Sequence, residues 1–180
     1  MTQGKVEFTS PFGIQEREQI LKAMDIHEDE LDQQCPIQIV STGHSKVIIG
    51  IKSRNKLDSL APNMHALAQM SKVIDCNGYF VFTMDSEETE ILTHGRMFAP
   101  AIGINEDPVT GNANGPLGAY LVEHGLVKPS GSEFSFKAEQ GHAIGRSGII
   151  EVSVKLSNGK PEKVKVGGKA VVVYKTQIDM

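Results

Sequence analysis

Short runs rich in Ile, Val and Phe recur along the chain and are separated by Gly, Pro, Asn and Asp. Runs of this length, alternating or continuous in hydrophobicity, are typical of β-strands. Two of them flank Gly43-His44-Ser45, which predicts a hairpin. The strands expected from the pattern are 5–9, 36–42, 46–52, 78–84, 89–93, 133–138, 149–156 and 164–174, the last of them broken by Gly167-Gly168.

Three stretches have helical rather than strand periodicity. The first is 15–25, and the second follows Asn63, where apolar residues recur every three or four positions. The third runs from about Ala113 to Glu123, is rich in small apolar residues and ends before Gly125. We expect 27–34 to be a loop or a short helix and 54–62 to be a polar connector.

The stretch before the third helix, 97–110, has no clear periodicity and is full of turn residues. We interpret it as a loop, and a loop of this length in a compact domain is often functional. It carries Asp107, Thr110, Gly111 and Asn112 to the point where the helix begins. The first turn of a helix presents free N–H groups and the positive end of the helix dipole, so it favours a carboxylate or phosphate. The alternative is ordinary helix capping with no ligand, which the spacing alone favours, whereas the long stretch before the helix favours a functional site.

Several motifs together resemble one known family. RMFAP at 96–100 and GINEDPVTGNA at 103–113 precede the apolar helix, and PIQIVSTG, GYFVFT, QGHAIGRSG and VKVGGKAVVV stand in the family's order. The chain resembles the PhzF-like isomerases of phenazine biosynthesis, which share the diaminopimelate epimerase fold. This implies an α+β fold in which a mixed β-sheet curls, barrel-like, around a central helix, here 113–123.

The resemblance covers only the second half of such a protein. Members of the family are longer, with a first domain that supplies a catalytic Glu and a Gly-His substrate loop. We therefore expect residues 1–35 to be a connector or remnant of a missing first domain, packed less tightly than the rest. Residues 36–180 correspond to the PhzF-like C-terminal domain, although the last strand could extend beyond that domain.

The family motif also implies roles for individual residues. Asp107 takes the position of an Asp that holds substrate and assists proton transfer, a role open to a carboxylate near a helix terminus. Thr110, Gly111, Asn112 and Ala113 would bind a substrate carboxylate, although the family commonly has Ser where Asn112 stands. Related epimerases use a reactive Cys here, and its absence excludes thiol-based racemisation. No cofactor and no metal are expected.

Other polar residues have simpler interpretations. Arg96 is placed to pair with Glu106 or Asp107, which we interpret as a structural ion pair. Glu106 and Asp107 are adjacent in sequence, so their side chains should point apart rather than act as a carboxylate pair. His94 precedes the loop at 97–110, and His44 lies in a turn, where an exposed His needs no function. His142 could face the cleft, but a single His in a loop is more often a bystander than a catalyst.

The composition of the chain limits the classes of partner that we expect it to bind. The 180-residue chain is 39% hydrophobic and 22% charged, with a net charge of −4. This mild acidity argues against nucleic acid as a partner. No apolar run reaches the length of a membrane span, and the N-terminus lacks a signal-peptide pattern, so we expect a cytoplasmic protein. Cys35 and Cys76 are far apart and suggest buried thiols rather than a disulfide or zinc site.

Two functions follow from the sequence. The first is a cofactor-independent isomerase or epimerase of a small carboxylate, incomplete alone and needing a separate chain with the catalytic Glu, unless the chain is a truncated product. The second is a catalytically silent domain that binds a ligand or dimerises. In either case a homo-oligomer is expected, because apolar surface left by the absent domain has to be covered.

Overall fold

A computed structural model describes residues 1–170 and 174–177. Nine strands in these residues form a single mixed sheet in the order β1-β2-β3-β4-β5-β7-β8-β9, with β6 on β5. The β3–β4 and β5–β7 pairs are parallel and the others antiparallel, so the predicted hairpin of β2 and β3 is confirmed. The strands are β1 Glu7–Phe8, β2 Gln38–Ser41, β3 Ser45–Gly50, β4 Tyr79–Thr83, β5 Ile91–Ala99, β6 Ile104–Asp107, β7 Glu133–Gln140, β8 Gly148–Ser157 and β9 Lys160–Gly167.

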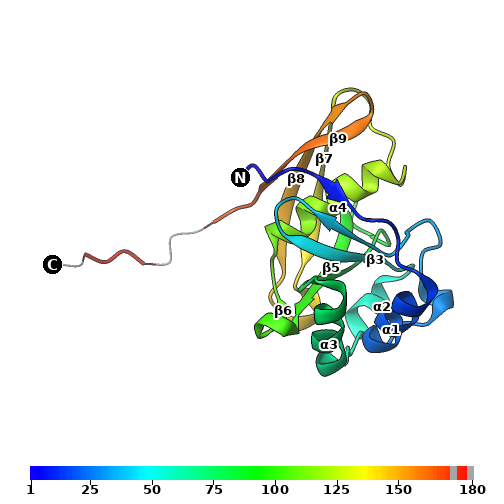
Figure 1. Cartoon of the computed structure of the whole chain (residues 1–180). Helices are drawn as coiled ribbons and strands as arrows, with labels where there is room; N and C mark the ends of the chain where they lie inside the picture. The colour runs from blue at the N-terminus through cyan, green and yellow to red at the C-terminus, as the bar shows by residue number, and fades with distance from the viewer. Residues whose placement is uncertain (171–173, 178–180) are drawn as a thin grey trace.

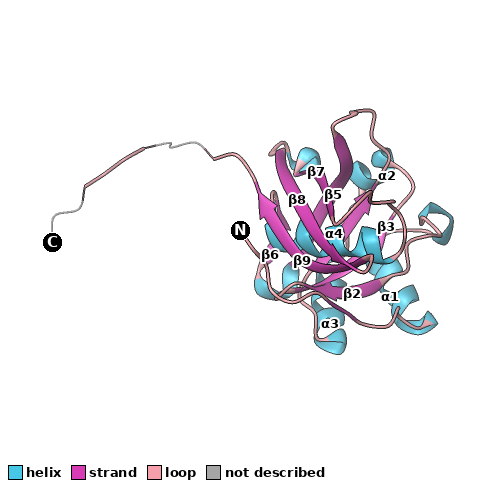
Figure 2. Ribbon diagram, turned by 90° about the horizontal axis from the view of Figure 1, so that it is seen from above, coloured by secondary structure: helices cyan, strands magenta, loops and turns pink. Residues whose placement is uncertain are grey.

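The N-terminal residues close the gap between the two ends of this sheet. Thr2 forms a bridge with Lys165 of β9, and the amide of Gln3 donates to the carbonyl of Val164. The next amide, that of Gly4, donates to the carbonyl of Thr42 at the end of β2. The sheet therefore curls into a nearly closed shell (Figure 2).

Helix α4, Gly111–Glu123, lies inside this shell (Figures 1 and 2). Residues 113–122 are all buried, as expected of a helix that is apolar on every side. Gly118 allows the close approach of β8, because a Cβ there would lie 2.7 Å from a methyl group of Val152. The predicted fold class, with a curled mixed sheet around a central helix, is confirmed.

A second apolar core covers the outer face of the sheet, where α1 Ile14–Met24, α2 Arg54–Ser59 and α3 Met64–Ile74 pack (Figure 1). Strand β4 shows why both faces are apolar, because Phe80 and Phe82 point to α4 whereas Tyr79 and Val81 point to the outer helices. Asn63 caps α3 as predicted, its Oδ1 accepting from the amide of Ala66.

Within residues 1–35, the side chains of Ile20 and Met24 on α1 are fully buried in this outer core. Two single-turn 3₁₀ helices nearby are η1 Glu28–Glu30 and η2 Pro100–Ile102, and a third is η3 His142–Ile144. The domain boundary near residue 35 stays a prediction.

Three element predictions were wrong. Residues 54–62 contain helix α2, whose start is capped by the Ser53 hydroxyl accepting from the amide of Lys56. The stretch 97–110 is not a loop, because β5 continues to Ala99 and β6 folds back onto it. The final strand begins earlier than predicted, at Lys160, and ends at Gly167, where the predicted strand was broken; the part of the predicted strand at 171–173 lies outside the described residues.

None of the helices in the described ranges combines the length and hydrophobicity that crossing a membrane requires. Cys35 and Cys76 are both buried and unpaired, as predicted.

Candidate functional site

Asp107 and Thr110 meet at the point where β6 ends and α4 begins. The Thr110 hydroxyl donates a 2.6 Å hydrogen bond to Oδ2 of Asp107. Thr110 is the N-cap residue of α4, yet its side chain makes no capping hydrogen bond to the helix amides. The Thr110 hydroxyl therefore orients the Asp107 carboxylate instead of satisfying the helix terminus, which is not the arrangement that simple capping requires.

Gln140, at the end of β7, holds the turn between Asp107 and Thr110 in place through side-chain hydrogen bonds. Its side chain is 1% exposed, and Nε2 donates to the carbonyl of Asp107 at 2.6 Å. Its Oε1 accepts from the amide of Thr110 at 3.1 Å and from the side-chain amide of Asn114 at 2.9 Å. Gln140 was not predicted at the site, because contacts between residues thirty positions apart leave no periodic signal in the sequence.

The first turn of α4 has free donors. The amides of Ala113 and Asn114 both donate to the carbonyl of Thr110. By contrast, the amides of Gly111 and Asn112 donate to no acceptor in the described part of the chain. Both residues are partly exposed, and unpaired N–H groups in the first turn of a helix are the groups that bind anions in proteins.

Gln3 covers the other side of this turn. Its Nε2 donates to the carbonyl of Gly111 at 2.9 Å and to Oδ1 of Asn112 at 3.3 Å, while its Oε1 accepts from the Thr42 hydroxyl at 2.6 Å. Ala113, also predicted at the site, has its side chain fully buried in the core. The structure thus brings Asp107, Thr110, Gly111 and Asn112 together, and Ala113 belongs to the same turn through its backbone only.

Arg96 and Glu106 form a bidentate ion pair, with Nε–Oε1 and Nη2–Oε2 distances of 2.9 and 2.7 Å. The Arg96 Nη1 also donates to the carbonyls of Leu57 and Leu60, so one guanidinium joins β5, β6 and α2. The interpretation of Arg96 as a structural ion pair is confirmed. Asp107 makes no ion pair with Arg96 among the described residues, so Glu106 and Asp107 have separate roles.

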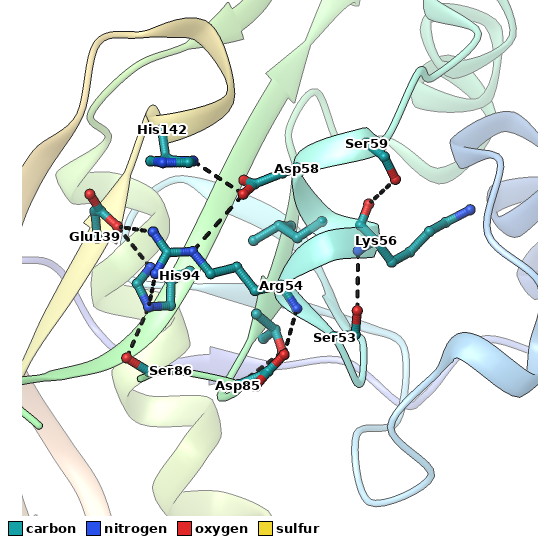
Figure 3. A network of polar contacts seen from close by, with 12 residues as sticks. Ser53, Arg54, Lys56, Asp58, Ser59, Asp85, Ser86, His94, Glu139 and His142 are labelled. Carbon is teal, nitrogen blue, oxygen red and sulfur yellow. Dashed lines mark hydrogen bonds and ion pairs between the residues drawn. The ribbon is translucent and has the colours of Figure 1, made fainter. Parts of the chain in front are cut away.

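A second polar network surrounds His94 and lies between α2, β5 and β7 (Figure 3). The ring nitrogens of His94, which is 3% exposed, lie 2.8 Å from Oε2 of Glu139 and 3.0 Å from the Ser86 hydroxyl. Arg54 donates to the same Glu139 oxygen at 3.0 Å and reaches Nε2 of His94 at 3.3 Å. His142 also joins the network, with its Nδ1 3.1 Å from Oδ2 of Asp58. Neither His94 nor His142 touches Asp107 through any hydrogen bond in the described residues.

Metal-binding potential in the described ranges is confined to this second network. Glu88, His94 and Glu139 offer ligand atoms within 4.8 Å of one another. The guanidinium of Arg54, however, donates to both carboxylates of this group and already supplies the positive charge. The chemistry of the set therefore fits an ion-pair network better than a cation site.

Comparison with known proteins places this geometry in context. Residues 6–176 match the family described as phenazine biosynthesis-like protein, PhzC-PhzF. The chain belongs to this family. An uncharacterized isomerase of Clostridium acetobutylicum is 58% identical over 178 residues, and the uncharacterized isomerase YddE of Escherichia coli K12 is 45% identical over 174 residues.

The same fold is present in solved structures. A PhzF-family phenazine biosynthesis protein of Bacillus anthracis superposes over 100% of this chain with a TM-score of 0.85 and 26% identity. A hydroxyproline epimerase of Agrobacterium vitis, with trans-4-hydroxy-L-proline bound, matches 72% of the chain at a TM-score of 0.51 and 11% identity, a likeness of fold alone.

The phenazine biosynthesis-like chain described here is shorter than these relatives. The match to the clostridial isomerase includes 99% of this chain but 59% of that protein. The match to YddE includes 97% of this chain but 58% of that protein. It likewise spans 60% of the Bacillus anthracis protein. About two fifths of each relative therefore has no counterpart in this chain.

Proposed function

We propose that this chain is the part of a PhzF-like isomerase that binds a small carboxylate substrate and moves a proton with Asp107. The observation that carries the proposal is the junction of β6 and α4, where an oriented carboxylate lies beside a helix terminus with two amides that have no acceptor among the described residues. The relatives named as isomerases support the reaction class.

The arrangement suits proton transfer at a carbon next to a carboxylate. The amides of Gly111 and Asn112 and the positive end of the α4 dipole would hold the substrate carboxylate. Negative charge that develops on that carboxylate when the neighbouring carbon loses its proton would be stabilised by the same donors. Asp107, oriented by Thr110 and anchored through its backbone by Gln140, would take up or return the proton. No step in this scheme needs a cofactor, and we propose that it takes place in the cytoplasm.

We further propose that a second domain or chain completes the site. Gly141 and Gly148, at the ends of the β7–β8 connection, pack against Pro108 and Val109, which follow Asp107. Five large apolar side chains are exposed in that connection, in its continuation into β8 and in the chain around Asp107, namely Ile102, Ile104, Val109, Ile144 and Ile149. Exposed apolar residues gathered around a polar site are typical of an interaction surface. The partner would be either the unmatched two fifths of the longer relatives, supplying the catalytic Glu, or a second copy of this chain.

Reassembly tests this proposal. The chain would be co-expressed with the unmatched part of the clostridial relative and incubated in deuterated water with small carboxylic acids that carry an α-hydrogen. Deuterium incorporation by the reassembled pair, and not by either part alone, is the expected result. A pair that co-purifies but exchanges no proton of any compound would favour the alternative function, a catalytically silent module that only binds or dimerises.

The alternative module makes its own prediction. If the exposed apolar segments serve self-association, light scattering on the purified chain gives a dimer that persists on dilution and that Ile149→Asp converts to a monomer. A monomer at every concentration would remove dimerisation from the account.

A further inference from the structure

A small cavity of about 270 Å³ lies at the end of the shell near the β2–β3 turn. Its walls come from that turn, from the loop between α3 and β4, and from the end of β5 with η2. Lys46, His44, Cys76 and Met97 are among its lining residues.

The cavity opens at the same end of the shell as the start of α4. Met97, which lines the cavity, is the register partner of Asp107 in the β5–β6 pair. On the opposite side, Thr42 immediately precedes the β2–β3 turn and its hydroxyl donates to Gln3, which in turn contacts Gly111. The residues that line or border the cavity are therefore in contact with the Asp107 turn on two sides, through the β5–β6 pair and through Gln3.

Lys46 is the unusual residue of this cavity. It is 7% exposed, and its ammonium donates only to the neighbouring carbonyl of Ser45, at 3.1 Å, among the described residues. Asp75, the acidic residue of the lining, is exposed and forms no ion pair with Lys46 in the described ranges. A buried ammonium without a counter-ion is costly unless something else compensates it.

The chain makes room for this side chain. A Cβ on Gly78, another lining residue, would lie 2.4 Å from Cδ of Lys46, so glycine at this position leaves room for the Lys46 stem in its present conformation. Burial lowers the pKa of the Lys46 ammonium, which means that an arriving anion would relieve an existing penalty.

We propose that the Lys46 cavity binds a second anionic group of the substrate, which makes the substrate a small dicarboxylate. One carboxylate lies at the amides of Gly111 and Asn112, and the other enters the cavity and pairs with the Lys46 ammonium. A cavity of about 270 Å³ has room for a carboxylate arm and is smaller than the pockets that enclose drug-sized ligands. This inference rests on the proposed function, because it assigns the second end of the same substrate.

The test is a titration followed by the amide resonances of the isotope-labelled chain. The probes are succinate, a dicarboxylate, and butyrate, which matches it in carbon number but has one carboxylate. Resonances of Ser45 and Gly78 report the cavity, and those of Gly111 and Asn112 report the helix terminus. The first variant is Lys46→Met, which keeps the apolar stem of the side chain and removes its charge. The control is Lys52→Met, which removes the same charge from an exposed position just after β3.

We expect succinate to shift both groups of resonances and butyrate to shift only those of Gly111 and Asn112. Lys46→Met should weaken succinate binding about tenfold and abolish the shifts at Ser45 and Gly78, because a charge-assisted hydrogen bond is lost. It should leave butyrate binding unchanged, and Lys52→Met should change neither.

The outcomes separate the inference from the function on which it rests. If succinate moves Gly111 and Asn112 but not Gly78, or binds Lys46→Met as tightly as the wild type, the dicarboxylate inference is overturned while the carboxylate site stands. If only the cavity resonances respond, the inference about Lys46 holds as an anion site and the proposed role of the α4 terminus fails. If neither probe moves either group, both are wrong.

Discussion

Replacing Glu106 with Gln should destabilise the protein more than any surface charge change. The side chains of Arg96 and Glu106 are only 9% and 10% exposed. Glu106→Gln keeps the shape of the side chain but removes the negative charge, and its amide N–H groups face the guanidinium donors. Arg96 keeps its hydrogen bonds to the carbonyls of Leu57 and Leu60, so its charge stays buried without a counter-ion.

The expected cost follows from that uncompensated charge. Removing one partner of a buried ion pair typically costs about 3–5 kcal/mol of the free energy of unfolding. For a domain of this length, each kcal/mol shifts the melting temperature by roughly 2–4 °C, so a decrease of about 6–20 °C is expected. Because Asp107 follows Glu106 directly on β6, the loss should also loosen the candidate site.

Guanidinium denaturation of the purified chain measures this cost, with Glu90→Gln as the matched control. Glu90 also contacts a cation, Lys137, at 2.6 Å, but its side chain is 76% exposed, so solvent screens the pair. The control should unfold like the wild type. If Glu106→Gln unfolds at the same denaturant concentration as Glu90→Gln, the Arg96 pair does not hold β5, β6 and α2 together, and that part of the account is wrong.

Three further predictions concern packing, thiols and pH. Gly118→Ala should cost roughly 1–3 kcal/mol of the free energy of unfolding, because the added methyl group would overlap β8. Gly167→Ala, where the added methyl group would have no atom within 4 Å, should leave the free energy of unfolding unchanged. Equal denaturation midpoints for the two variants would contradict the close packing of α4 on β8. A thiol reagent should label Cys35 in guanidinium but not in the native chain, and rapid labelling of native Cys35 would show that the core around α4 is open. Burial raises the pKa of Cys35 and of Tyr79 to about 12, so the native state holds these protons more tightly than the unfolded state; the stability they contribute is complete below pH 9 and is lost as the pH rises from about 9 to 12. Cys35→Ala should make this decline shallower, and an unchanged slope would exclude the thiol as a cause.

Much of the fold was predictable because the apolar pattern is local. The hairpin at Gly43, the cap at Asn63 and the small-residue helix after Gly111 each follow from a few neighbouring residues. Strand β6 was not predictable in this way, because all four of its residues are exposed or only partly buried and it exists through pairing with β5. Helix α2 carries one buried residue, Leu57, which is too little for an amphipathic pattern.

Part of the candidate site could also be predicted from neighbouring residues, and part of it could not. Asp107, Thr110 and Gly111 lie within one short motif, so their proximity was predictable from sequence spacing. Gln140 was not, because only the parallel pairing of β5 and β7 brings it to the turn. The Lys46 cavity also depends on long-range packing, since it unites the β2–β3 turn with the end of β5.

The most direct test of the central claim is the rate of solvent-deuterium incorporation by the reassembled enzyme with wild-type Asp107 and with Asp107→Asn. The Asn side chain can still accept the Thr110 hydrogen bond, so the circular dichroism spectrum and melting temperature should be unchanged. Asn cannot carry the proton, and exchange should fall to the uncatalysed level. Full exchange activity in a folded Asp107→Asn variant would contradict the assignment of proton transfer to this residue.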